Sequence, residues 1–349
     1  EGTYRCAVAG QTASLRVQRD PYRNLLTQPL AHLRRVRSGP DVAPPRRPSH
    51  PGDARAPVWI PDGDPAEGRW KPDPEGHAVD VEGGWYDAGD QLKFTLNTAY
   101  TTFHLLLAWE FAPHLFPSPQ GDALPGILDE ARHGLDWLMK VHPSDAIFVV
   151  QVGDSRDHNQ PFRLPEDDAL DGDRPALCAL SQVHMHAAAA ALARGAVVFD
   201  RIGRRQEAEA YGNEAIRIFE RALGAGTRTT VFYRDVTNDF YHDTTLEDQL
   251  ALAAASLHRW TGDPGFLALA IDAAPPADTE PSWRAWHWSA NFALAPVDPA
   301  SAARLVEQGN RHAHDAREDG APWGIPGRYV WGGLHRWTEM AIATRLADF

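Results

Sequence analysis

From about residue 98 onward, apolar residues recur at helical spacing in one segment after another, and short connections that contain proline or glycine separate these segments. Strand signals in this region are weak and are confined to 147–150 and 231–233. An all-α domain of this size must bury one face of each helix, and no repeat of fixed period is present. We therefore expect a ring of paired helices rather than a solenoid. The pattern predicts helices over 98–112, 123–141, 183–199, 203–223, 246–262, 264–273, 298–314 and 333–349.

The N-terminal part of the chain has a different character. Residues 3–18 alternate apolar and polar positions around Ala9-Gly10, which predicts a β-hairpin. Because a lone hairpin is barely stable, we expect it to have belonged to a larger β module. Asp20-Pro21 is typical of a helix start. The proline-rich stretch between Pro40 and Pro74 is predicted to contain no regular element.

Charge and missing motifs exclude several classes of function. The formal net charge is −13, which argues against a nucleic-acid partner because such proteins need a basic surface. No apolar run is long enough to span a membrane. The sequence lacks the glycine loops that bind nucleotides and the GxSxG elbow of α/β-hydrolases. We therefore expect no cofactor.

No metal ligand set is assigned from the sequence. Asp168, Asp171 and Asp173 lack the spacing of an EF-hand calcium loop. His184 and His186 lie two positions apart in a predicted helix, so their side chains face apart, and both are expected on its surface.

The sharpest local feature is the segment Gly83-Gly84-Trp85-Tyr86-Asp87-Ala88-Gly89-Asp90. Asp87 and Asp90 are three positions apart and project to one side of a turn or helix start. Neighbouring carboxylates perturb each other's pKa, as acid–base chemistry requires. Trp85 and Tyr86 would add an aromatic wall, which suits a sugar ring. The alternative interpretation is an acidic loop that caps the following helix.

A second polar cluster runs from Gln151 to His158 and continues through Arg163-Leu164-Pro165-Glu166-Asp167-Asp168. It is rich in hydrogen-bonding groups and predicts a loop. The sequence alone leaves open whether this loop contributes to a site or is simply solvated.

The stretch Asp80–Phe94, DVEGGWYDAGDQLKF, resembles the signature of glycoside hydrolase family 9, which comprises cellulases and related β-glucanases. The resemblance runs from about residue 20 to the end and implies an (α/α)6 barrel over residues 19–349. Residues 1–18 resemble the last strands of the immunoglobulin-like module that precedes this domain in one branch. Further matching segments follow in the family's order: DPYRNLL at 20–26, HGLDWL at 133–138, DFY at 239–241, DQLAL at 248–252, RWTGDP at 259–264 and RYVWG at 328–332.

The resemblance implies hydrolysis of β-1,4-glucosidic bonds in cellulose or related β-glucans with inversion at the anomeric carbon. Asp90 matches the general base, and Asp87 matches the partner that positions the attacking water. His158 matches a histidine that contacts the sugar beside the cleavage site. Phe240, Tyr241 and Trp331 fall on aromatic positions of the substrate cleft.

The resemblance also implies what this chain lacks. The family's catalytic acid follows the YVWG segment at a distance that places it beyond Phe349, and Glu339 is not a substitute. We therefore expect a chain truncated at both ends, an incomplete barrel without its last helices, and weak or no activity from this chain alone. We further expect a secreted monomer whose partner is a β-glucan. Family members often hold structural calcium, for which no ligands are assigned here.

Two alternative functions stay open at this point. The first is a protein that binds glucan through the cleft aromatics without cutting it. The second is a different helical-barrel enzyme that acts on sugars, such as an epimerase.

Overall fold

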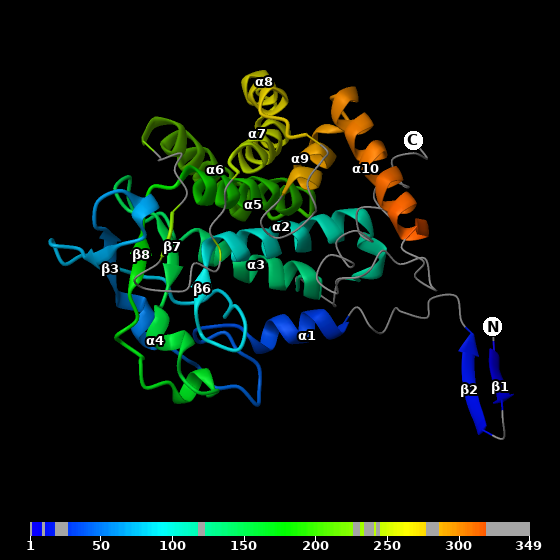
Figure 1. Ribbon diagram of the computed structural model, residues 1–349, viewed down its shortest axis with the longest axis horizontal. Helices are drawn as coiled ribbons and strands as arrows, with labels where there is room; N and C mark the ends of the chain where they lie inside the picture. Colours follow the sequence, from blue (N-terminus) through cyan, green and yellow to red (C-terminus); the bar gives the residue numbers. More distant parts are fainter. Residues whose placement is uncertain are drawn as a thin grey trace.

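Helices form most of the described residues after residue 95 in the computed structural model (Figure 1). The predicted helical pattern is confirmed for each segment between 98 and 314, whereas 333–349 lies outside the described residues. The short helix α9 was not predicted.

The structure describes residues 2–8, 11–17, 27–117, 123–225, 231–233, 241, 245–276 and 286–318. The helices are α1 (Thr27–Arg35), α2 (Thr95–Phe111), α3 (Gly126–Leu138), α4 (Ser155–His158), α5 (Gln182–Arg201), α6 (Arg205–Ala225), α7 (Glu247–Thr261), α8 (Pro264–Asp272), α9 (His287–Leu294) and α10 (Pro299–Glu318), with short 3₁₀ turns at Pro51–Arg55, Pro65–Glu67, Pro113–Leu115 and Pro165–Asp167.

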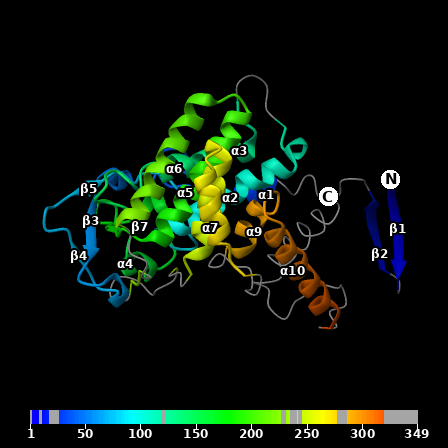
Figure 2. The same ribbon diagram turned by 90° about the horizontal axis from the view of Figure 1, so that it is seen from above.

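Helix α5 lies at the centre of the helical part and packs against α2, α6 and α7 (Figures 1 and 2). Its alanine run, residues 187–191, is fully buried. Because neighbouring helices cover several sides of α5, its apolar residues lie all round the helix rather than along one face. Its small side chains let these helices approach closely. Further helices pack around this group: α3 contacts α2, α8 and α9 contact α7, and α10 contacts α9.

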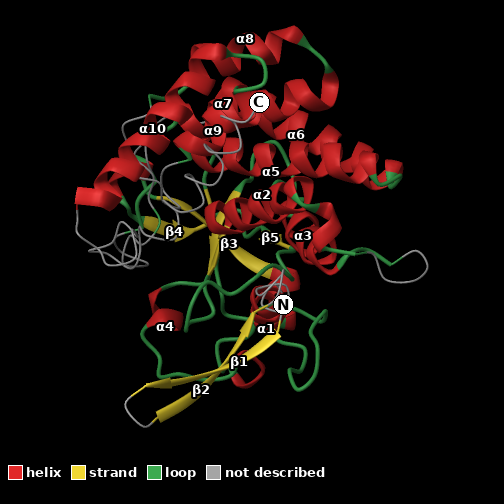
Figure 3. Cartoon of the chain, turned by 90° about the vertical axis from the view of Figure 1, so that its right-hand side faces the viewer, coloured by secondary structure: helices red, strands yellow, loops and turns green. Residues whose placement is uncertain are grey.

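A mixed β-sheet closes one end of the helical part (Figures 1 and 3). The all-α expectation is therefore wrong for this region. The strand order is β4-β3-β8-β7-β6, with β5 also paired to β3. Strands β3 and β8 run parallel and the other pairs are antiparallel. The strands are β3 (Ala56–Pro61), β4 (Trp70–Pro72), β5 (Ala78–Val79), β6 (Lys93–Phe94), β7 (Val149–Val152) and β8 (Ala176–Cys178).

The expectation that the proline-rich stretch holds no regular element is also wrong, because β3 and β4 lie within it. Pro61 and Pro72 are the last residues of their strands, where a missing N–H costs no ladder bond inside the strand. Pro57 pairs with Ala78, and the next residue, Val58, supplies the N–H that bonds to His77 O. The sheet thus tolerates its prolines by placing them at strand ends and in short pairings.

The predicted N-terminal hairpin is confirmed as β1 (Gly2–Val8) and β2 (Gln11–Val17), paired from Gly2–Val17 to Val8–Gln11. Its described side chains are exposed, and it lies apart from the helices in Figures 1 and 2. Its assignment to an immunoglobulin-like module, with a boundary after residue 18, stays a prediction.

Helices α2 and α3 meet at a glycine that also receives the Trp85 ring. A Cβ atom added at Gly134 would overlap Thr102 Oγ1 of α2 and would lie 2.5 Å from Cη2 of Trp85. Gly224, near the end of α6, has nothing within 4 Å of the same position. The close approach at Gly134 therefore holds the loop that carries Trp85 against α3.

We predict that Gly134→Ala lowers the free energy of unfolding by about 1–3 kcal/mol, because the added methyl overpacks this contact. The matched control Gly224→Ala should be neutral or stabilising by up to about 1 kcal/mol, since alanine favours the helix. Urea unfolding followed by circular dichroism measures both. Equal effects of the two substitutions would show that the contact at Gly134 does not constrain the fold.

Candidate active site

The segment from Gly83 to Asp90 is a tight loop pressed onto α3. Gly83 and Gly84 have φ values of +100° and +73°, which favour glycine. A Cβ atom on Gly84 would lie 2.9 Å from the Trp137 ring of α3, too close for any other residue. Trp137 Nε1 in turn donates to the Val81 carbonyl at 3.0 Å. The loop then runs through β6 into the first turn of α2, so Asp87 and Asp90 lie close to the start of that helix.

The two aromatic residues of the motif face inward. Trp85 is 5% exposed and its Nε1 donates to Glu130 Oε1 of α3 at 2.8 Å. Tyr86 is 3% exposed, and its hydroxyl bonds to Ser49 and His50. Both rings border a hollow of about 200 Å³ beside Asp87, but most of their surface is buried. The two rings therefore line the hollow only in part, and their main contacts hold the loop in place; their role toward a sugar stays a prediction.

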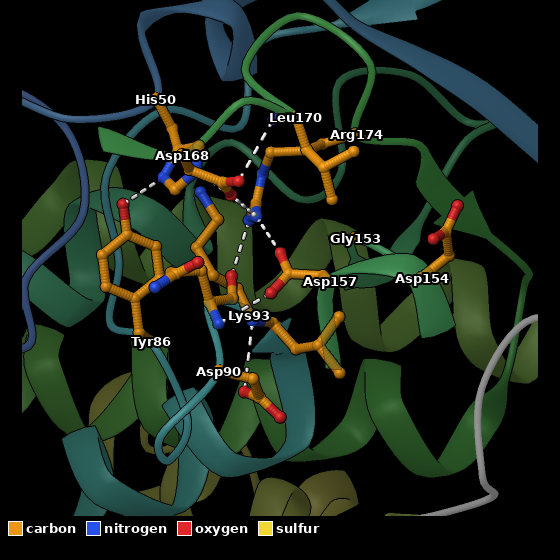
Figure 4. A network of polar contacts seen from close by, with 12 residues as sticks. His50, Tyr86, Asp90, Lys93, Gly153, Asp154, Asp157, Asp168, Leu170 and Arg174 are labelled. Carbon is orange, nitrogen blue, oxygen red and sulfur yellow. Dashed lines mark hydrogen bonds and ion pairs between the residues drawn. The ribbon is translucent and has the colours of Figure 1, made fainter. Parts of the chain in front are cut away.

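His50 links Tyr86 to the second polar cluster (Figure 4). Its Nε2 lies 2.9 Å from Asp168 Oδ2, so this nitrogen carries the proton, and Nδ1 accepts from the Tyr86 hydroxyl. Burial and the charge of Arg174 lower the pKa of His50, which keeps the imidazole neutral. Asp168 also accepts from Arg163 Nε at 2.9 Å.

The centre of this network is the guanidinium of Arg174, which is fully buried (Figure 4). It donates to Asp53 Oδ1 at 3.0 Å, to Asp157 Oδ2, and to the Gln91 carbonyl at 2.6 Å. Asp157 Oδ1 accepts from the Gln91 N–H at 2.9 Å. Both backbone groups of Gln91, the residue after Asp90, are therefore fixed by one buried ion pair.

The buried charges balance. Three carboxylates (Asp53, Asp157 and Asp168) face three cations (Lys93, Arg163 and Arg174). Burial alone would raise the pKa of Asp53, but Lys93 and Arg174 outweigh it and the pKa is lowered. Burial lowers the pKa of Lys93 to about 8, although Asp53 partly offsets this. Such a set of ions is stable only when each has its partner.

Asp87 and Asp90 occupy unlike environments. Asp87 Oδ1 accepts from Asn97 Nδ2 at 2.7 Å, and Oδ2 accepts from the Tyr241 hydroxyl at 2.6 Å. Burial raises the pKa of Asp87, the two donors lower it in part, and the charge of Asp90 raises it again. Asp90 Oδ2 lies 2.7 Å from His158 Nδ1, and the side chain of His158 is 37% exposed.

The structure thus brings together Asp87, Asp90, His158 and Tyr241 of the predicted site residues. Tyr241 hydrogen-bonds to Asp87, a contact that the sequence did not predict. Phe240 and Trp331 lie outside the described residues. Asn97 was missed, because nothing marks an asparagine in the first turn of an amphipathic helix as part of a site.

The second polar cluster is not a solvated loop. Asp157 and Asp168 are buried and hold the network together, whereas Asp171 accepts from the Gly52 N–H and Asp173 pairs with Arg156. The three aspartates considered for calcium thus point to different partners. In the part of the chain that the structure describes, no three His, Cys, Asp or Glu residues are grouped as metal ligands.

The histidines at 184 and 186 are buried, which corrects the expectation that they lie on the helix surface. His184 of α5 bonds to the Oγ of Ser181, the residue before this helix, at 3.0 Å. Among the described helices, none is long and apolar enough to cross a membrane.

Comparison with known proteins decides the family. The model of glycosyl hydrolase family 9 matches residues 22–347. The chain belongs to this family. Endoglucanase 18 of Oryza sativa subsp. japonica is 29% identical over 198 residues, which cover 55% of this chain and 37% of that relative. The chain spans less than half the length of such curated relatives.

Solved structures of family members share the fold. A thermostable endoglucanase from Alicyclobacillus acidocaldarius superposes with a TM-score of 0.79 at 24% identity, covering 99% of this chain and 67% of that chain. AaCel9A in complex with cellobiose-like isofagomine gives 0.77 at 24% identity, covering 99% and 67%. Because the family model matches residues 22–347, the alternative of a helical-barrel enzyme from another family, such as an epimerase, is not supported.

The neutral state of His50 leads to a prediction about pH and stability. In the unfolded chain a histidine takes up a proton near pH 6.5, but the folded pKa of His50 is lower. The unfolded state therefore binds more protons as the pH falls, and the stability present above pH 6.5 is lost on acidification. His50→Asn should reduce this loss, because asparagine does not titrate, its amide oxygen can accept from Tyr86 at the place of Nδ1, and it tolerates the left-handed backbone found here, with φ 50°.

The measurement is the melting temperature between pH 5 and pH 8. His50→Asn should flatten its fall between pH 7 and pH 5, whereas His114→Asn, at an exposed histidine outside the network, should leave the slope of the natural protein unchanged. An unchanged slope in His50→Asn would show that His50 is not held neutral by burial.

Proposed function

We propose that this chain forms the general-base side of an inverting β-1,4-glucanase that acts on cellulose or related β-glucans. The observation that carries the proposal is the pair of carboxylates on one rigid loop, with His158 against Asp90 and two neutral donors against Asp87. Asp90 acts as general base and Asp87 positions the attacking water. Family membership and the endoglucanase relatives support the substrate class.

The chemistry follows from the arrangement of the two carboxylates. In an inverting glycosidase, a carboxylate removes a proton from water as the water attacks the anomeric carbon. A second carboxylate that accepts the other hydrogen of the same water fixes its direction of attack. This requires water and carboxyl groups and no cofactor.

The remaining parts of the proposal rest on the family. The helices belong to an (α/α)6 barrel, and the mechanism also needs a second carboxyl group that protonates the leaving oxygen. That acid is not among the residues assigned here, so residues 1–349 alone are expected to be weakly active. We further infer a secreted monomer whose partner is a β-glucan chain that lies across His158 and the aromatic residues Phe240, Tyr241 and Trp331.

The first test removes the base. In the protein expressed from its natural reading frame, Asp90→Ala should lower kcat on cello-oligosaccharides by about 10²–10⁴-fold while binding is retained, because general-base catalysis supplies that much rate. Added azide should restore turnover to Asp90→Ala and yield a glycosyl azide of inverted configuration. The matched control Asp154→Ala removes a carboxylate that pairs with Arg156 at the same loop cluster and should leave kcat near that of the unmodified protein.

Two outcomes separate the alternatives. Near-normal turnover by Asp90→Ala would overturn the assignment of the base. Glucan binding without turnover by the unmodified protein would favour the non-catalytic glucan-binding alternative. For an active protein, proton NMR of the first product resolves the mechanism, because inversion releases the α-anomer from a β-glucan.

A further inference from the structure

Asn97 is the one donor from a regular element that contacts the carboxylate of Asp87 in the described part of the chain. Its Nδ2 lies 2.7 Å from Asp87 Oδ1, and it sits in the first turn of α2. The backbone N–H groups at the start of a helix also favour a nearby negative charge. Unlike Tyr241, which lies on a connecting segment, Asn97 is fixed by a helix of 17 residues.

Two donors on opposite oxygens fix the plane of the carboxylate. Asn97 takes one lone pair of Oδ1 and Tyr241 takes one of Oδ2, so each oxygen keeps one lone pair in a fixed direction. An asparagine cannot ionise, so it donates at every pH. It also adds no positive charge, and therefore it orients Asp87 without neutralising it.

We propose that Asn97 is a positioning residue that keeps Asp87 ionised and oriented toward the attacking water, and so sets the acidic limit of activity. This inference rests on the proposed function. The groups near Asp87 are the Tyr241 hydroxyl, the Asp90 carboxylate, the Leu92 carbonyl, which accepts from the Asp87 N–H at 2.9 Å, and His32 of α1, which borders the same hollow. Burial already favours the neutral acid, so loss of a donor shifts the balance further toward protonation.

The test is the pH profile of kcat/KM for a series of substitutions in the protein expressed from its natural reading frame. Asn97→Leu keeps the size but removes the donor, and should move the acidic limb upward by about one pH unit or more, since hydrogen bonds to charged groups are the strong ones. Asn97→Asp places a second carboxyl against Asp87 and should move the limb further. Asn97→Ser, which keeps a hydroxyl donor, should recover part of the shift.

Thr101→Val is the matched control. Thr101 borders the same hollow one turn further along α2 but is not among the groups that shift the pKa of Asp87, so the profile should be unchanged. KM should change less than twofold in all variants, because Asn97 acts through Asp87 and not on the sugar. At the midpoint of the unmodified acidic limb, kcat of Asn97→Leu should be about fivefold lower for a shift of one pH unit and should recover as the pH rises.

The outcomes distinguish this inference from the proposed function. If Asp90→Ala is inactive but Asn97→Leu and Asn97→Asp lower kcat equally at every pH, Asn97 has only a packing role and the inference is wrong. If Asp90→Ala keeps its turnover, the proposed function itself fails. The positioning role is supported if the acidic limb moves upward in Asn97→Leu and further upward in Asn97→Asp. The melting temperature of Asn97→Leu should then stay within a few degrees of that of the unmodified protein.

Discussion

Burial of the Arg174 guanidinium between Asp53 and Asp157 is the interaction on which the rest of this site depends. Its three donating edges reach a carboxylate beside the sheet, a carboxylate at α4 and the Gln91 carbonyl of the loop. A planar fork with donors in fixed directions can join three segments at once, which a lysine ammonium on a flexible stem does less well. Because each ion would be costly to bury alone, the set forms as a unit. The loop conformation is therefore coupled to the folding of the sheet.

This set of buried ions positions Asp90, the proposed base, and its hydrogen-bond partner His158. Gln91 follows Asp90 in the chain, and Asp157 precedes His158. Since Asp157 accepts from the Gln91 N–H at 2.9 Å, the contact brings the two neighbouring side chains together, and Asp90 meets His158 at 2.7 Å. An exposed hydrogen bond between these groups alone would be worth little against the entropy of two mobile loops. The buried contact one residue away supplies the constraint instead.

The sequence predicted the helices and the two carboxylates but not the framework around them. Helical periodicity relates residues three or four positions apart, so α2, α5 and α7 could be located from their apolar residues. The strands of the sheet are two to six residues long, and two of them end in proline, so most leave no pattern of their own. Only β7 overlaps a strand signal, the weak one at 147–150. Asp53 and Arg174 are separated by 121 positions, and nothing in the sequence of either segment relates the two.

The motif itself was predictable in composition but not in orientation. The adjacency of Trp85, Tyr86 and Asp87 suggested one shared face. In the structure, the φ values of Gly83 and Gly84 turn both rings toward α3 and His50 and leave Asp87 at the hollow. Local spacing relates neighbouring side chains only in a regular element, and this loop is not one.

The division of partners among the acids explains how the loop can keep a reactive charge. Lys93 and Arg174 donate to backbone carbonyls of Gly83 and Gln91, and each also pairs with a buried carboxylate behind the loop. Within the described residues, Asp87 contacts neutral donors only, namely Asn97 and Tyr241. A carboxylate paired with arginine would have its pKa lowered and its charge largely neutralised, so it would attract little proton density from a water. Neutral donors fix the geometry of Asp87 and leave its negative charge in place, and the closed set of ions beneath the loop keeps arginine and lysine away from it.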